Sequence, residues 1–123
     1  MATHNDFGIL AEDLAVEYLK KNGYKILVRN FRFKKNEIDI IAEKDELIII
    51  TEVKARSTDA FILPQEAVTK TKIRSIVLAA NHYLEEFDKN KEVRFDIITV
   101  LPDEKGKLVI KHITNAFEAF DAN

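Results

Sequence analysis

The sequence contains no cysteine and no tryptophan, and only three glycines and two prolines among its 123 residues. The absence of cysteine excludes disulfide bonds and thiolate metal sites and suits a reducing cytoplasm, which is the compartment we expect. Because no apolar run approaches membrane-spanning length and no apolar leader segment begins the sequence, we expect neither membrane insertion nor export. With few chain-breaking residues and 46% hydrophobic residues, the sequence predicts one compact domain over residues 1–123.

Acidic residues are missing from residues 20–36, although the net charge of the whole chain is −2. This segment has seven lysines and arginines, and Lys34 and Lys35 lie near its end. The negative total argues against a protein that coats nucleic acid by bulk electrostatics, whereas a local basic edge would suit a phosphodiester backbone. A solvated edge strand protected by lysines explains the same residues without a ligand, so both interpretations stay open at this point.

The stretch 36–56 consists of two runs rich in isoleucine and valine, separated by a short polar segment. This pattern predicts two β-strands joined as a hairpin. If Asp45 and Glu46 form a two-residue loop, the numbers of facing residues add up to 91, so Asp39 lies opposite Glu52. A four-residue loop centred on the same pair keeps this sum, so the expected pairing does not depend on the turn type.

Strict alternation along the two strands predicts one shared face, apolar near the turn and charged at the open end, formed by Glu37, Asp39, Ile41, Ile50, Glu52 and Lys54. Two facing carboxylates repel each other unless a positive charge lies between them. Mg²⁺ and Mn²⁺ bind oxygen ligands of this kind, so Asp39 and Glu52 are candidate metal ligands and Lys54 would point at the substrate. The alternative is a solvated ladder in which Glu37 faces Lys54, but this leaves Asp39 against Glu52 unexplained.

Helical periodicity predicts a first helix from about residue 5 to 22, ended by Gly23. Glu12 falls at the margin of its apolar stripe, from which it could reach over the sheet toward Asp39; a solvated surface glutamate is the alternative. The stretch 24–33 predicts a strand that leads into the hairpin.

A second helix is predicted from Thr69 or Thr71 to about Phe87. Cations at a helix N-terminus oppose the macrodipole, which favours a phosphate partner over ordinary capping, although screened surface charges are the alternative. The polar and positive residues at this start are Gln65, Lys70, Lys72 and Arg74. The preceding stretch 57–63, followed by Pro64, predicts a loop that could contact the substrate.

The rest of the sequence predicts strands over 93–101 and 108–114 and a short helix or hook over 116–120. Asp96 is the one acid within the first of these strands, and it is either a structural partner of a basic residue or a neighbour of the site. His82 and His112 have no partner at metal-ligand spacing, so we interpret both as ordinary structural or surface histidines.

The order helix, three strands, helix, strand, with an acid on the second strand and Glu-x-Lys on the third, resembles the PD-(D/E)XK nuclease superfamily. More closely, the sequence is similar to the YraN-like family of small bacterial proteins within it. The matching motifs are Gly8-x-x-Ala11-Glu12, Gly23-Tyr24, Arg29-Asn30, Glu37-Ile38-Asp39, Glu52-Val53-Lys54-x-Arg56, Glu66-Ala67-Val68 with Lys72, Ala80 with Tyr83-Leu84, and Arg94-Phe95-Asp96. One departure is Asn36, where the family usually has glycine.

The resemblance implies an α/β fold with a restriction endonuclease-like αβββαβ core, in which helices flank a mixed central sheet. It implies that Asp39 and Glu52 bind the metal, that Lys54 orients or polarises the attacking water, and that Glu12 completes the acidic cluster. It also places accessory polar groups at Gln65 and Lys72. Together with the basic segment, the predicted nucleic-acid contacts are Lys34, Lys35, Arg56, Gln65 and Lys72.

These observations predict a metal-dependent nuclease that uses Mg²⁺ or Mn²⁺ to cleave DNA or another structured nucleic acid. The alternative from another class is a non-catalytic nucleic-acid-binding or assembly module that keeps the fold; a protein-interaction domain is a third reading. The acidic pair favours the enzyme, because a module that only binds gains nothing from two acids that face phosphate.

Overall fold

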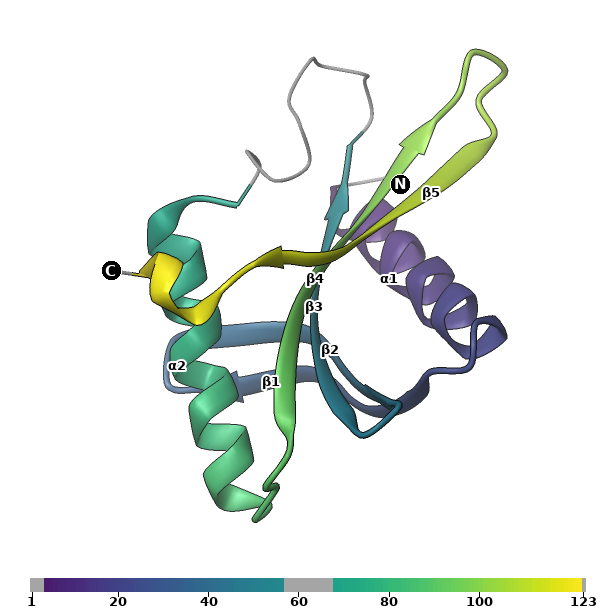
Figure 1. Ribbon diagram of the computed structural model, residues 1–123. Helices are drawn as coiled ribbons and strands as arrows, with labels where there is room; N and C mark the ends of the chain where they lie inside the picture. Colours follow the sequence, from purple (N-terminus) through teal and green to yellow (C-terminus); the bar gives the residue numbers. More distant parts are fainter. Residues whose placement is uncertain (1–3, 57–67, 123) are drawn as a thin grey trace.

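The computed structural model describes residues 4–56 and 68–122 (Figure 1). The predicted loop 57–63, Pro64 and Gln65 lie outside the described residues. The order of elements agrees with the expected one. The elements are α1 (His4–Lys21), β1 (Lys25–Phe33), β2 (Asn36–Lys44), β3 (Leu47–Ala55), α2 (Lys70–Glu86), β4 (Glu92–Pro102), β5 (Leu108–Phe117) and the 3₁₀ helix η2 (Ala119–Ala122).

The strands form one five-stranded sheet in the order β1-β2-β3-β4-β5. β3 and β4 are parallel, whereas the other neighbours are antiparallel. The helix α2 lies in the crossover between the parallel strands, and the two long helices lie on opposite sides of the sheet (Figure 1). The predicted restriction endonuclease-like αβββαβ core with a mixed sheet is therefore confirmed.

Two apolar cores hold the helices to the sheet. In the α1-side core, Ala11, Ala15 and Leu19 pack with Ile40 and Ile49. In the α2-side core, residues of α2 pack with isoleucines of β2, β3 and β4, among them Ile41, Ile48, Ile50 and Ile97. The central strands are thus buried on both faces, which explains their near-continuous apolar sequences.

The β2–β3 hairpin has the predicted register. Asp45 and Glu46 form its two-residue loop, and both have the positive φ values, 50° and 68°, that a type I′ turn requires. Paired residues run from Lys44 with Leu47 to Ile40 with Thr51.

The expected alternation of side chains fails at Asp39. Ile38 and Ile41 are three positions apart, so strict alternation would place them on opposite faces of the sheet. Both nevertheless pack in the α2-side core, whereas Ile40 packs in the α1-side core. The facing position on β1 is Asn30, whose φ of 53° is left-handed. Both strands therefore kink here, so the prediction that Glu37 and Asp39 share the face of Ile41 and Ile50 is wrong.

The described residues contain no helix that is long and apolar enough to cross a membrane.

Candidate functional site

Asp39 lies where the regular pairing of β2 with β3 ends. The last paired residues are Ile40 and Thr51, and continuing the register by one step places Asp39 opposite Glu52. Oδ2 of Asp39 accepts a hydrogen bond of 2.7 Å from the backbone N–H of Val53. Because of the kink, the Asp39 side chain is directed at the β3 backbone, and this bond fixes the orientation of its carboxyl group.

Glu52 is a buried acid whose side chain is only 6% exposed. Its Oε2 has no hydrogen-bond partner among the described residues. Burial, followed by the hydrogen-bonding and charge of Asp39, raises the pKa of Glu52 to about 9, against the opposing effects of Lys72 and Lys54. In the absence of a cation, Glu52 therefore keeps its proton at neutral pH.

Glu12 approaches the same acids from α1. Burial and then the charge of Asp39 raise the pKa of Glu12, and the guanidinium group of Arg29 opposes this effect. Oε1 of Glu12 lies 4.0 Å from Arg29 and, within the described part of the chain, accepts no hydrogen bond. Asp39 thus interacts with Glu12 of α1 and with Glu52 of β3, but the three acids do not form one cluster in the described part of the chain.

Two lysines accompany the acids. Nζ of Lys72, in the first turn of α2, lies 3.6 Å from Oε2 of Glu52. Thr69 is the N-cap of this helix, since its hydroxyl accepts a hydrogen bond from the Lys72 backbone N–H. Lys54 is half-buried two residues beyond Glu52, and its charge favours the ionised form of that acid.

The other predicted nucleic-acid contacts are spread over the molecule. Lys34 and Lys35 are exposed in the β1–β2 turn, and Nζ of Lys34 lies 5.3 Å from the centre of the Phe33 ring. Arg56 follows β3, and its backbone N–H donates to the carbonyl oxygen of Val100. Gln65 is outside the described residues, so the structure does not place it near the acids.

The carboxylates offer a divalent cation only part of its ligand set. Within residues 4–56 and 68–122, no group of three or more histidines or acids has the arrangement of a metal site. The donors that are present, Asp39 and Glu52, are hard oxygen ligands, and the buried Oε2 of Glu52 has no other hydrogen-bond partner there. Mg²⁺ usually keeps several waters and binds through one or two carboxylates plus substrate phosphates, so this donor set fits such a cation.

Comparison with known proteins gives a family for the chain. The model of the family described as "Uncharacterised protein family UPF0102" matches residues 11–100. The chain belongs to this family. UPF0102 is the YraN family of the resemblance described above, so that assignment is confirmed.

UPF0102 relatives match the chain over almost their whole length. The UPF0102 protein FP2501 of Flavobacterium psychrophilum is 48% identical over 120 residues, which cover 98% of this chain and 100% of the relative. The UPF0102 protein BF0634 of Bacteroides fragilis is 49% identical over 117 residues, 95% of this chain and 96% of the relative. A solved structure titled "Crystal structure of SSO0001" superposes with a TM-score of 0.47 at 15% identity over 98% of this chain and 57% of that one.

Two contacts of the site were not expected from the sequence. Lys72 was predicted to contact nucleic acid, whereas in the structure it faces Glu52. Arg29 was assigned to the basic segment and to a family motif without a partner, but it bonds Asp13 at 2.8 Å and lies beside Glu12. A strand arginine and helix acids 16 or 17 positions earlier show no periodic relation, so the sequence carries no signal for this pair.

Proposed function

We propose that the protein is a metal-dependent nuclease that hydrolyses phosphodiester bonds of DNA or another structured nucleic acid, with Mg²⁺ or Mn²⁺ bound by Asp39 and Glu52. The observation that supports this most is the state of Glu52. It is buried against a second acid, its Oε2 has no hydrogen-bond partner among the described residues, and its pKa is raised to about 9. Such a costly arrangement is expected where a cation replaces the proton.

The bound cation would supply charge stabilisation at the scissile phosphate and a more acidic water. Asp39 would present its carboxyl group in a fixed orientation, because Val53 N–H already holds Oδ2. Lys72 favours the ionised form of Glu52, which is the form that binds metal. Lys54 would contact the attacking water or the phosphate as negative charge develops there.

The alternative is a non-catalytic nucleic-acid-binding or assembly module of the same fold. One observation favours it: the described residues lack a cluster of three metal-binding side chains. The two functions differ in what Lys54 does, because only an enzyme needs a cation that acts on the transition state.

Replacing Lys54 with alanine tests the proposal. We expect cleavage of a branched or flapped DNA duplex in Mg²⁺ or Mn²⁺ to fall on the order of 10²-fold or more. Metal affinity should stay nearly constant or rise slightly, because Lys54 contributes no ligand and its charge repels the cation. Lys89→Ala is the matched control, since it removes the same charge from a half-buried residue just beyond the end of α2, at the opposite end of that helix from Lys72.

Cleavage rates and metal affinities are to be measured on all three proteins. Unchanged cleavage by Lys54→Ala would remove the catalytic role of this lysine. Absence of cleavage by the wild-type protein over a broad panel of DNA and RNA substrates would favour the binding module instead.

A further inference from the structure

The side of the sheet that faces α2 changes from apolar to polar residues at the level of the acids. On three neighbouring strands the α2-side core ends with Ile50, Ile97 and Ile113. Beyond them, this face continues with Glu52 and Lys54 on β3, Thr99 on β4 and Lys111 on β5, and the apolar Leu101 and Val109 follow only nearer the β4–β5 turn. The change therefore extends past the hairpin of the acids and includes β4 and β5.

Three of these residues form a row across the strands. Lys54 on β3 is paired with Thr99 on β4, and Thr99 is paired with Lys111 on β5. The neighbours of Lys111 confirm the face on which it lies, because Ile110 packs in the α1-side core and Ile113 against the α2-side core. We refer to Lys54, Thr99 and Lys111 as the cross-strand row.

The charges of this row are not neutralised by acids in the described part of the chain. No ion pair there includes Lys54 or Lys111, whereas Arg29, Arg32 and Arg94 each pair with an acid. Between the lysines, the Thr99 hydroxyl is buried and has no hydrogen-bond partner among the described residues. The buried hydroxyl adds no charge between them, so the two unpaired lysines form a positive surface complementary to phosphate.

We infer that the cross-strand row binds the backbone of the nucleic-acid strand as it leaves the acidic site, and that Lys111 contacts a phosphate there. The inference rests on the proposed function, because it takes Asp39 and Glu52 as the position of the scissile phosphate. Two strand spacings separate Lys54 from Lys111, which is about 10 Å. This distance equals the rise of roughly three nucleotides along one strand of B-DNA, so the phosphate of Lys111 lies about three nucleotides from the cut.

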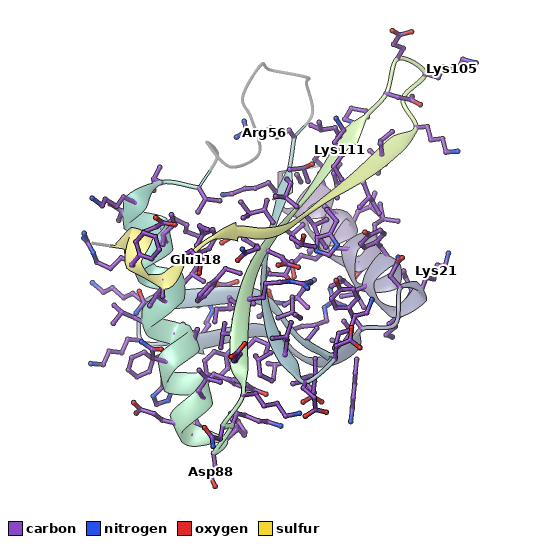
Figure 2. All side chains as sticks on the ribbon, in the orientation of Figure 1. Lys21, Arg56, Asp88, Lys105, Lys111 and Glu118 are labelled. Atoms are coloured by element: carbon purple, nitrogen blue, oxygen red, sulfur yellow. The ribbon has the colours of Figure 1, made fainter. Side chains whose placement is uncertain are left out.

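The row also gives the substrate a direction across the sheet. The exposed lysines of the β1–β2 turn, Lys34 and Lys35, lie on the other side of the acids in the strand order. A strand bound over Lys111 would cross β4 and β5 at right angles to them. Figure 2 shows Lys111 and Arg56 at the same end of the sheet, whereas Lys21 lies apart at the end of α1.

Replacing Lys111 with alanine tests this inference in a binding assay that needs no cleavage. The probe is a fluorescein-labelled DNA duplex with a single-stranded arm, titrated in EDTA at several salt concentrations and followed by fluorescence anisotropy. We expect several-fold weaker binding and a salt slope smaller by about 0.9, the value for one lost phosphate contact. Lys89→Ala, with the same change in charge just beyond the end of α2, should match the wild-type protein.

Equal salt slopes for Lys111→Ala and wild-type protein, equal effects of Lys111→Ala and Lys89→Ala, or no binding of the probe by wild-type protein would each overturn the inference. Cleavage measured in parallel separates the two proposals. If the wild-type protein cleaves DNA and Lys111→Ala does not change binding, the nuclease proposal holds and the cross-strand row is excluded as a binding site. If Lys111→Ala weakens binding but no cleavage is detected, the row is supported as a binding site and the nuclease proposal is not.

Discussion

Two buried acids on neighbouring strands, Asp96 of β4 and Glu52 of β3, have opposite surroundings. Asp96 is paired with Thr51, the residue before Glu52, and is fully buried on the α1 side of the sheet. Its carboxylate accepts hydrogen bonds from Arg94 at 2.8 and 2.9 Å and from the Asn115 backbone N–H at 3.0 Å. Nε2 of His112 lies 2.7 Å from the same carboxylate.

The pKa values of the two acids differ accordingly. Burial alone would raise the pKa of Asp96, but the hydrogen bonds from His112, Arg94 and Asn115 lower it below the ordinary value. Burial beside Asp39 raises the pKa of Glu52. The Asp96 carboxylate is fully hydrogen-bonded, whereas Oε2 of Glu52 has no hydrogen-bond partner among the described residues. This difference is a reason to look for function at Glu52 and for stability at Asp96.

The largest expected effect comes from changing each acid to its amide. Asp96→Asn should lower the free energy of unfolding by about 3–5 kcal/mol, because Arg94 and His112 lose a buried charged partner. Glu52→Gln should raise it in EDTA at neutral pH, because the folded protein no longer has to hold a proton that the unfolded chain releases. Urea denaturation measures both values.

Glu104→Gln is the control for this pair, since Glu104 is exposed and its change should stay within about 0.5 kcal/mol. Destabilisation of similar size by Asp96→Asn and Glu52→Gln would contradict the comparison, because it would make both acids structural.

The pH dependence of stability gives the second test. With its pKa raised to about 9 in the folded state, Glu52 stays protonated there after the unfolded chain has ionised. The unfolded state then binds fewer protons, so stability in EDTA falls from about pH 5 to pH 8, by at most about 1.4 kcal/mol per pH unit. Asp96 does not contribute in this range, since its lowered pKa makes its contribution disappear only in more acidic solution.

The measurement is the difference in unfolding free energy between wild-type protein and Glu52→Gln over that range. The difference should widen as the pH rises, because only the wild-type protein carries the titrating carboxyl group. Parallel curves would mean that Glu52 ionises normally in the folded protein.

The two acids were not equally predictable from the sequence. The register of the β2–β3 hairpin, which leads up to Asp39 and Glu52, followed from the sequence, because the loop length fixes it locally. Asp96 could only be given two possible roles, and the structural one is correct. Its partners come from β4 and β5, and the contact of His112 with Tyr18 joins residues 94 positions apart. Such contacts depend on how distant elements pack, which no local pattern encodes.

The failure of alternation at Asp39 has a similar cause. Asn30 permits the left-handed backbone, but many asparagines in strands do not adopt it, and the kink forms here because two opposite cores accept Ile38 and Ile40. The cross-strand row was likewise hidden. Lys54 and Lys111 share a row only because both are paired with Thr99, and this depends on the parallel register of β3 with β4. That register forms after a long crossover through α2.

Metal binding gives the smallest and most direct test of the comparison. A cation that binds the folded acids but not the unfolded chain stabilises the protein by mass action, by about 2.7 kcal/mol at a concentration 100 times the dissociation constant. We expect Mg²⁺ or Mn²⁺ to raise the melting temperature of wild-type protein and of Glu104→Gln, and to leave Asp39→Asn and Glu52→Gln unchanged. The shift should grow with pH, because the cation must replace the proton on Glu52.

Identical melting of the wild-type protein in EDTA and in millimolar Mg²⁺ or Mn²⁺, from acidic to alkaline solution, would show that these acids form no strong metal site before substrate binds. Lys72 would then be the first candidate partner of the ionised Glu52 carboxylate, since its Nζ lies 3.6 Å from Oε2.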